Sequence, residues 1–258
     1  MTTTISVINQ KGGVGKTTTV INLAASLSIL GHNNLVIDLD PQGNATTGFG
    51  KSNNDEDKNI YNLLIKKITL GQVIQKTNIQ NLDIIGSHVN LSGLEVETAN
   101  DPNRAFLLKE IFKKNENLFS KYENIFIDCP PSLSLLTIMS LVAAEELLVP
   151  LQTEFFALEG ITQLVKTIER IKINLNPNLE IRGILLTMFD KRNKLSAQVD
   201  EEARKYFKDK VYKTVIPRNV RLSEAPSHGV PCLVYDKGCV GSKSYLDLAG
   251  EFINQNRI

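Results

Sequence analysis

The sequence is poor in cysteine. It contains three cysteines, Cys129, Cys232 and Cys239, and no C-x-x-C pair. Zinc cages and disulfide frameworks need clustered or paired cysteines, so this spacing argues against both kinds of site. We expect the three thiols to be buried or incidental side chains, as free cysteines commonly are, and their scarcity fits a reducing cytosol.

The sequence also lacks a long hydrophobic run. Its longest apolar segment covers residues 133–151, and Glu145 and Glu146 interrupt it. A membrane-spanning helix needs about 20 consecutive apolar residues, so this segment is expected to form a buried helix and strand instead. The opening residues, MTTTISVINQK, have no basic start followed by an apolar stretch. No secretion signal is therefore predicted, and we expect a cytoplasmic protein.

Neither sign of charge dominates the chain as a whole. The 29 basic and 28 acidic residues give a net charge of +1. A charged partner must therefore be met by a local patch. Residues 182–221 form the best candidate, with 11 basic and 5 acidic residues. Since non-specific DNA binding is dominated by charge, this region is predicted to face a phosphate backbone, although a merely solvated face is the alternative.

Hydrophobic periodicity predicts strands that alternate with helices. Short apolar runs predict strands at residues 5–8, 34–39, 82–85, 124–128, 146–150, 182–188 and 211–216. Helical spacing predicts helices at residues 17–30, 104–119, 158–175 and 242–253. The pattern favours an α/β fold with a twisted, mostly parallel sheet flanked by helices on both faces. The glycine-rich, charged segment 48–59 is predicted to be an exposed loop, and residues 1–258 are expected to form one domain.

A glycine-rich segment, QKGGVGKTTT at residues 10–19, joins the first predicted strand to the first predicted helix. It resembles the phosphate-binding loop G-x-x-x-x-G-K-[ST], but Gln10 stands where the first glycine is usual. Such a turn aims backbone N–H groups at one point, and the helix N-terminus adds partial positive charge, so phosphate is the expected ligand. The predicted ATP-binding residues are Lys11, Gly12, Gly13, Val14, Gly15, Lys16, Thr17 and Thr18.

Three of these residues have distinct expected roles. Lys16 would contact the β- and γ-phosphates, the Thr17 hydroxyl would ligate Mg²⁺, and Thr18 would donate to the α-phosphate. ATP and Mg²⁺ are therefore the expected ligands, and the chain is predicted to be a P-loop NTPase.

Lys11 is a second ammonium group at the mouth of the same loop. It would repel Lys16 in an empty site, so its presence needs a separate explanation. A positive group supplied by a neighbouring subunit can stabilise the transition state of phosphoryl transfer, as an arginine finger does. We interpret Lys11 as such a lysine finger, while a solvated surface lysine is the alternative.

Two carboxylates lie at the ends of other predicted strands. Asp128 follows the apolar run Ile125-Phe126-Ile127, where P-loop enzymes place a carboxylate near magnesium. Asp40 ends another strand, and we expect it to orient the attacking water. A magnesium-water ligand and a turn cap remain alternatives for Asp40. Asp38 lies two residues earlier and is a weaker candidate for the same site.

Four ordered motifs together resemble the ParA/Soj branch of the deviant Walker-A ATPases, the chromosome and plasmid partition proteins. They are KGGVGKTT at residues 11–18, DLDPQGNAT at 38–46, IDCPPSL at 127–133 and VIPRNVRLSEAPSHG at 215–229. The resemblance implies a magnesium-dependent ATPase that forms a nucleotide sandwich dimer in which Lys11 reaches the other subunit's phosphates. It also implies a dimer that binds double-stranded DNA without sequence preference at the nucleoid, and a ParB-like partner that stimulates hydrolysis.

The same resemblance assigns further residues. Pro217 and Asn219 match positions near the adenine, with a proline-asparagine turn as the alternative. Arg192 and Arg221 match the DNA-contacting positions, and the lesser candidates are Lys191, Lys194 and Arg218.

Two other functions share this fold or loop. MinD-type positioning ATPases have a similar loop and a basic amphipathic C-terminal helix for the membrane, whereas residues 251–258, EFINQNRI, contain one arginine and little apolar face. Membrane binding is therefore not expected. A metabolic P-loop ligase is the second alternative, because fold alone does not decide function.

Overall fold

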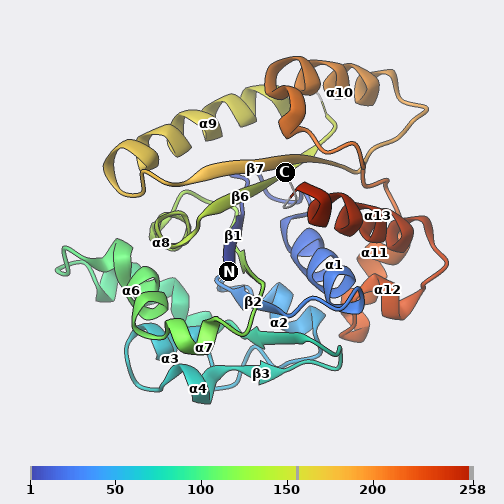
Figure 1. Cartoon of the computed structure of the whole chain (residues 1–258). Helices are drawn as coiled ribbons and strands as arrows, with labels where there is room; N and C mark the ends of the chain where they lie inside the picture. Colours follow the sequence, from blue (N-terminus) through green and yellow to red (C-terminus); the bar gives the residue numbers. More distant parts are fainter. Residues whose placement is uncertain (1, 155–156, 256–258) are drawn as a thin grey trace.

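The computed structural model describes residues 2–154 and 157–255, and these residues form a seven-stranded sheet with helices on both faces (Figure 1). The strand order across the sheet is β3-β4-β2-β5-β1-β6-β7. All neighbouring strands are parallel except β3 and β4, which are antiparallel. The strands are β1 (Thr3–Val7), β2 (Asn34–Asp38), β3 (Gln75–Lys76), β4 (Leu82–Ile85), β5 (Asn124–Asp128), β6 (Glu146–Gln152) and β7 (Glu180–Thr187). The predicted α/β fold with a mostly parallel sheet is confirmed.

Two clusters of buried apolar side chains cover the two faces of the sheet. On one face pack α1 (Lys16–Ile29), α2 (Asn44–Gly48), α11 (Val220–Glu224), the 3-10 helix η4 (Ala225–His228), α12 (Cys232–Tyr235) and α13 (Val240–Gln255). The other face is covered by α3 (Ile60–Leu64), α4 (Leu70–Val73), η1 (Val89–Gly93), α5 (Leu94–Glu97), α6 (Leu107–Lys114), α7 (Glu116–Phe119), α8 (Leu135–Ala143), α9 (Ala157–Asn174) and α10 (Lys194–Phe207). Figure 1 shows α1, α11, α12 and α13 together on one side, opposite α6 and α8.

The predicted strand at residues 211–216 is wrong. This segment contacts β7 only through isolated bridges, Ile184 to Val211 and Phe189 to Pro217. The backbone N–H groups of Lys213 and Thr214 donate instead to the Glu251 carboxylate on α13, at 2.7 and 2.9 Å. A side chain therefore takes the hydrogen bonds that a continuous strand would give to its neighbour.

The predicted helix at residues 104–119 is interrupted. A 3-10 turn, η2 (Arg104–Phe106), precedes α6, and Asn115 separates α6 from α7. Asn115 has φ −126°, and its side-chain amide donates to the Ile111 carbonyl at 2.9 Å. Asparagine side chains compete in this way for backbone groups, which ends the helix locally. A short 3-10 helix, η3 (Lys208–Lys210), likewise follows α10.

Two other segments behave largely as expected. The apolar segment 133–151 forms α8 and most of β6, as predicted. Residues 51–58 form a mostly exposed loop, but Gly48 is buried at the end of α2 and Asn59 is buried at the start of α3. None of the helices in the described ranges combines the length and apolar character that crossing a bilayer requires.

The strand order reverses beside β1, which lies between β5 and β6. Parallel α/β sheets bind their ligands in the crevice at the carboxyl ends of the strands, at such a reversal. At this end lie the glycine-rich loop after β1, Asp40 after β2, and Asp128 as the last residue of β5. The fold therefore brings three of the sequence motifs to one edge of the sheet.

Candidate nucleotide-binding site

The glycine-rich loop runs from the end of β1 to the first residue of α1. Gly13 has φ 74° and Gly15 has φ 89°, left-handed conformations that glycine adopts without strain. The Thr187 hydroxyl at the end of β7 donates to the Val14 carbonyl at 2.8 Å and fixes the loop from outside. The first N–H groups of α1 have no acceptors within the helix, so the loop and helix end together present donors to an anion.

Lys16 is buried inside this loop and only 6% exposed. Its Nζ donates to the Lys11 carbonyl at 2.9 Å. Burial lowers the pKa of Lys16, while the nearby Asp128 carboxylate acts in the opposite direction. An ammonium held in this position could meet phosphate oxygens at the loop centre.

Asp128 ends β5 directly opposite Asp38 of β2 in the parallel ladder. Both carboxyl groups are fully buried. Among the described residues, neither oxygen of Asp128 has a hydrogen-bond partner, although Thr17 lies close enough to act toward a lower pKa. Burial, and then the negative charge of Asp38, raise the pKa of Asp128 well above its usual value. A buried carboxylate without a partner suits a site that is completed by a positively charged ligand.

The residues around Asp128 fit a magnesium site of the kind completed by a nucleotide. Within residues 2–154 and 157–255, no group of three or more acidic, histidine or cysteine side chains is arranged to hold a metal by itself. Mg²⁺ in nucleotide sites is commonly bound by one or two protein groups together with substrate phosphates and water. The Thr17 hydroxyl and the Asp128 carboxylate could provide those protein groups.

The two other carboxylates of the site are held differently. Asp38 accepts hydrogen bonds from the Thr46 N–H and hydroxyl, both at 2.7 Å, and from the Asp40 N–H at 3.2 Å. Burial raises the pKa of Asp38 to about 6 despite these bonds. Asp40 is 6% exposed and accepts from the Gln42 N–H at 3.0 Å through one carboxylate oxygen. Asp38 therefore ties β2 to α2, whereas Asp40 keeps an oxygen available.

Lys11 points away from the loop that its backbone helps to form. Its N–H donates to the Asn9 side chain at 3.0 Å, while its Nζ forms an ion pair with Glu154, just after β6. The Lys11 side chain is 49% exposed. Glu154 was not predicted from the sequence, because nothing in a lone glutamate after a strand indicates which lysine it will meet.

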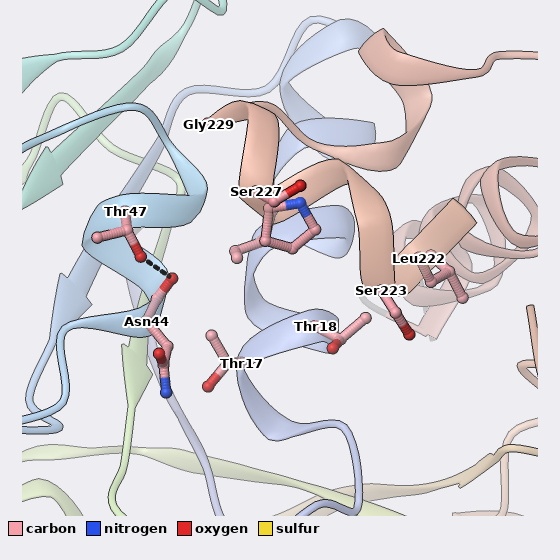
Figure 2. Close-up of a pocket in the computed structure, with 10 residues that line it drawn as sticks. Thr17, Thr18, Asn44, Thr47, Leu222, Ser223, Ser227 and Gly229 are labelled. Carbon is pink, nitrogen blue, oxygen red and sulfur yellow. Dashed lines mark hydrogen bonds between the residues drawn. The ribbon is translucent and has the colours of Figure 1, made fainter. Parts of the chain in front are cut away.

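A pocket of about 620 Å³ opens beside Thr17 and Thr18 (Figure 2). Figure 2 shows α1, α2 and the segment from α11 to Gly229 surrounding it. The remaining lining residues are Ile21, Asn44, Thr47, Leu222, Ser223, Pro226, Ser227 and Gly229. This volume is in the usual range for small-molecule sites. Most lining residues outside α1 belong to the sequence motifs at 38–46 and 215–229, so a signal for them was present.

Pro217 and Asn219 come shortly before the pocket-lining residues of α11 in the sequence, and neither of them lines the pocket. Pro217 forms the bridge with Phe189, and the Asn219 side chain caps α11 by accepting from the Arg221 N–H at 2.9 Å. Their predicted contact with adenine stays a prediction.

Arg192 and Arg221 lie on adjoining segments, and each pairs with carboxylates of its own chain. Arg192 is 91% exposed and binds Asp190 through two nitrogens, both at 3.1 Å. Arg221 binds Glu224 at 2.8 Å and lies 3.4 Å from Asp236. The two segments meet where the Phe189 N–H donates to the Ile216 carbonyl at 3.0 Å. These internal ion pairs were not anticipated from the sequence.

The chain is similar to known proteins over most of its length. Residues 2–181 match the family model described as "AAA domain". The chain is 48% identical to the chromosome partitioning protein ParA of Caulobacter vibrioides over 256 residues, covering 98% of this chain and 94% of the relative. It is 46% identical to the chromosome-partitioning ATPase Soj of Treponema pallidum, covering 97% of this chain and 96% of the relative.

A solved structure shares the fold at a lower identity. The cobyrinic acid a,c-diamide synthase of Mycobacterium smegmatis, with bound ADP and magnesium, is 29% identical with a TM-score of 0.86. The match covers 100% of this chain and 96% of that one. The sequence identities extend over nearly the whole chain. They point to the same family as the glycine-rich loop and the carboxylates at the strand ends. The chain belongs to the ParA/Soj family of partition ATPases.

Proposed function

We propose that ATP joins two copies of this chain into a sandwich dimer that binds double-stranded DNA without sequence preference. Hydrolysis, stimulated by a ParB-like partner, then separates the dimer and releases the DNA. The observation that carries this proposal is the separation of the two loop lysines. Lys16 is buried inside its own loop, whereas Lys11 is half-exposed and directed outward. One ammonium is thus suited to the chain's own nucleotide and the other to a nucleotide held by a second copy.

Within one subunit, different residues contact different parts of ATP. The N–H groups of Gly12, Gly13, Val14 and Gly15 surround the phosphates, and Lys16 neutralises the β- and γ-phosphate oxygens. Thr18 donates to the α-phosphate, and Pro217 and Asn219 contact the adenine. The support for the phosphate contacts is the left-handed geometry of Gly13 and Gly15 together with the buried Lys16.

Magnesium, when bound, neutralises negative charge on the β- and γ-phosphate oxygens. Thr17 and Asp128 would hold it, the first through its hydroxyl and the second through its partnerless carboxylate. Asp40 orients the water that attacks the γ-phosphorus. The bond between this phosphorus and the β–γ bridging oxygen breaks, ADP leaves with that oxygen, and the proton of the water passes to the released inorganic phosphate. Lys11 of the second copy stabilises the charge that develops on the transferred group.

DNA is bound through charge presented by residues after β7. Arg192 and Arg221 contact phosphate oxygens once these replace the internal carboxylates Asp190 and Glu224. A dimer doubles the patch, so avidity rises when ATP joins the subunits. Residues 1–258 then act as one ATPase unit in the cytoplasm at the nucleoid.

The test is ATPase activity measured with and without plasmid DNA and a ParB-like partner. Stimulation that needs both is expected, because hydrolysis resets a DNA-bound state. Full activity without either would favour a metabolic enzyme. Co-sedimentation of the ATP-loaded protein with anionic liposomes but not with DNA would favour a MinD-like positioning ATPase. The last three residues of the C-terminal segment that bears on this alternative lie outside the described residues.

A further inference from the structure

Two of the three cysteines lie side by side. Cys232 is the first residue of α12, and Cys239 immediately precedes α13. Their sulfur atoms are 3.4 Å apart. The expectation that the thiols are buried or incidental is confirmed in the burial of Cys129 and Cys232, but it did not include the contact into which the turn between the two helices brings Cys232 and Cys239.

The start of α13 places a backbone N–H group against the Cys239 sulfur. The Cys239 carbonyl accepts from the Lys243 N–H at 3.2 Å, as expected for a residue that caps a helix. Its sulfur accepts from the Ser242 N–H at 3.4 Å. Burial acts to raise the pKa of the Cys239 thiol, but hydrogen bonds from Ser242 and Cys232 outweigh it, and the pKa falls below its usual value. A thiolate at a helix N-terminus is the reactive form of cysteine.

The two cysteine side chains differ in exposure. An accessible thiol that reacts first, next to a second thiol that closes the disulfide, is a common arrangement in redox-sensing pairs. Cys239 is partly exposed, whereas Cys232 is fully buried and its pKa is raised to about 11, mainly by burial. Cys129 provides an internal contrast. It is buried between Ser6 and Ser140, away from the other cysteines, and burial raises its pKa to about 12.

We propose that Cys239 and Cys232 form a reversible oxidation site that closes to an intramolecular disulfide in response to a peroxide. The Cys239 thiolate attacks one peroxide oxygen, the O–O bond breaks, and Cys239 becomes a sulfenic acid while hydroxide leaves. Cys232 then loses its proton and attacks the sulfenic sulfur, which expels a second hydroxide. The two thiols lose two electrons, and the peroxide takes them up as water. The sulfurs need to approach by about 1.4 Å to reach a normal disulfide length.

The segment between the two cysteines also contacts Arg221. Asp236 lies 3.4 Å from the Arg221 guanidinium, and the Tyr235 ring lies beneath that group. Asp236 is tied to both cysteines, because its N–H donates to the Cys232 carbonyl at 2.7 Å and its carboxylate accepts from the Cys239 N–H at 3.1 Å. Oxidation therefore acts on the turn that faces Arg221.

The reduced chain is treated with hydrogen peroxide and denatured, and its free thiols are alkylated. The disulfides are then reduced, and the thiols that this releases are labelled with a second alkylating reagent. Peptide mapping should place the second label on Cys232 and Cys239 together, and dithiothreitol applied before the first alkylation should remove it. Cys129 should carry the first label throughout. Second label on Cys129, a disulfide between two chains, or oxidation of Cys239 with Cys232 still free would each overturn the proposal.

Two variants separate the steps. In Cys232→Ser, Cys239 should accumulate as a sulfenic acid that dimedone traps, because the second thiol is missing. In Cys239→Ser, Cys232 should resist the same peroxide treatment. Equal dimedone labelling in the two variants would contradict the assignment of Cys239 as the attacking thiol. Should either serine variant fail to fold, the mapping of the unaltered chain still decides the proposal.

Discussion

Lys11 forms an ion pair with Glu154 of its own chain. The two residues lie 143 positions apart in the sequence, and the pair joins the loop after β1 to the segment after β6. In the proposed dimer, Lys11 must leave Glu154 before it can reach the nucleotide of the second copy. The ion pair of the separate subunit therefore competes with formation of the proposed dimer.

Replacing Glu154 with glutamine should favour dimer formation by ATP. An exposed ion pair contributes about 0.2 to 1 kcal/mol, and each dimer breaks two of them, so the protein concentration at half-dimerisation should fall by roughly two- to thirtyfold. Sedimentation velocity with ATP and magnesium measures this directly. Glu169→Gln on α9 is the matched control, because Glu169 is exposed and has no ion pair among the described residues. A weaker dimer in Glu154→Gln would mean that Glu154 supports the dimer instead.

The second prediction concerns Asp128 and pH. An acid whose pKa is higher in the folded than in the unfolded chain binds its proton more tightly when folded, so the free energy of unfolding falls as pH rises through that range. The pKa of Asp128 is raised well above 3.8, and that of its neighbour Asp38 to about 6. Asp128→Asn removes the buried charge, so it should stabilise the nucleotide-free protein by roughly 1 to 3 kcal/mol at neutral pH.

Urea unfolding between pH 4 and pH 7 measures this effect. The stability difference between Asp128→Asn and the unaltered chain should increase with pH over that range. Asp209→Asn, at an exposed position after α10, should show no such trend. An Asp128→Asn variant that is less stable at neutral pH would show that the carboxylate has a stabilising partner in the empty site.

The third prediction concerns the arginines after β7. Arg192→Glu combined with Arg221→Glu should lose DNA retention and keep ATP-dependent dimerisation, because both side chains are exposed and neither lines the pocket beside Thr17 and Thr18. Removing two phosphate-binding charges should also make the affinity for DNA fall less steeply with salt. Lys67→Glu combined with Lys113→Glu makes the same charge change at two exposed lysines outside the basic segment 182–221 and should bind DNA much better than the arginine variant. Equal losses in the two double variants would indicate a general charge effect.

The sequence predicted the parts of the fold and site that depend on neighbouring residues. Apolar β-branched runs identified six strands to within a few residues, and the glycine spacing identified a loop whose left-handed residues are Gly13 and Gly15. The ends of parallel strands share one sheet edge, so Asp128 could be placed near the loop before its partners were known.

The features that were missed depend on contacts between distant segments. Hydrophobic periodicity suggested a strand at residues 211–216, but it could not reveal that Glu251 takes the hydrogen bonds of that segment. The pairing of Lys11 with Glu154 is likewise invisible to local spacing. The contact between Cys232 and Cys239 depends on how the chain turns between two helices. Side-chain partners of this kind follow from packing, which residue type and periodicity do not specify.

Mixing two inactive variants tests most directly whether Lys11 acts across the dimer. Lys11→Ala and Asp40→Ala should each lack ATPase activity alone. In an equal mixture, a mixed dimer has one intact site, so activity should recover to at most roughly a quarter of the unaltered level, because half of the dimers are mixed. Lys16→Ala mixed with Asp40→Ala should recover none, since Lys16 serves its own subunit. No recovery in the first mixture, with mixed dimers shown to form, would contradict the action of Lys11 on the second copy's nucleotide.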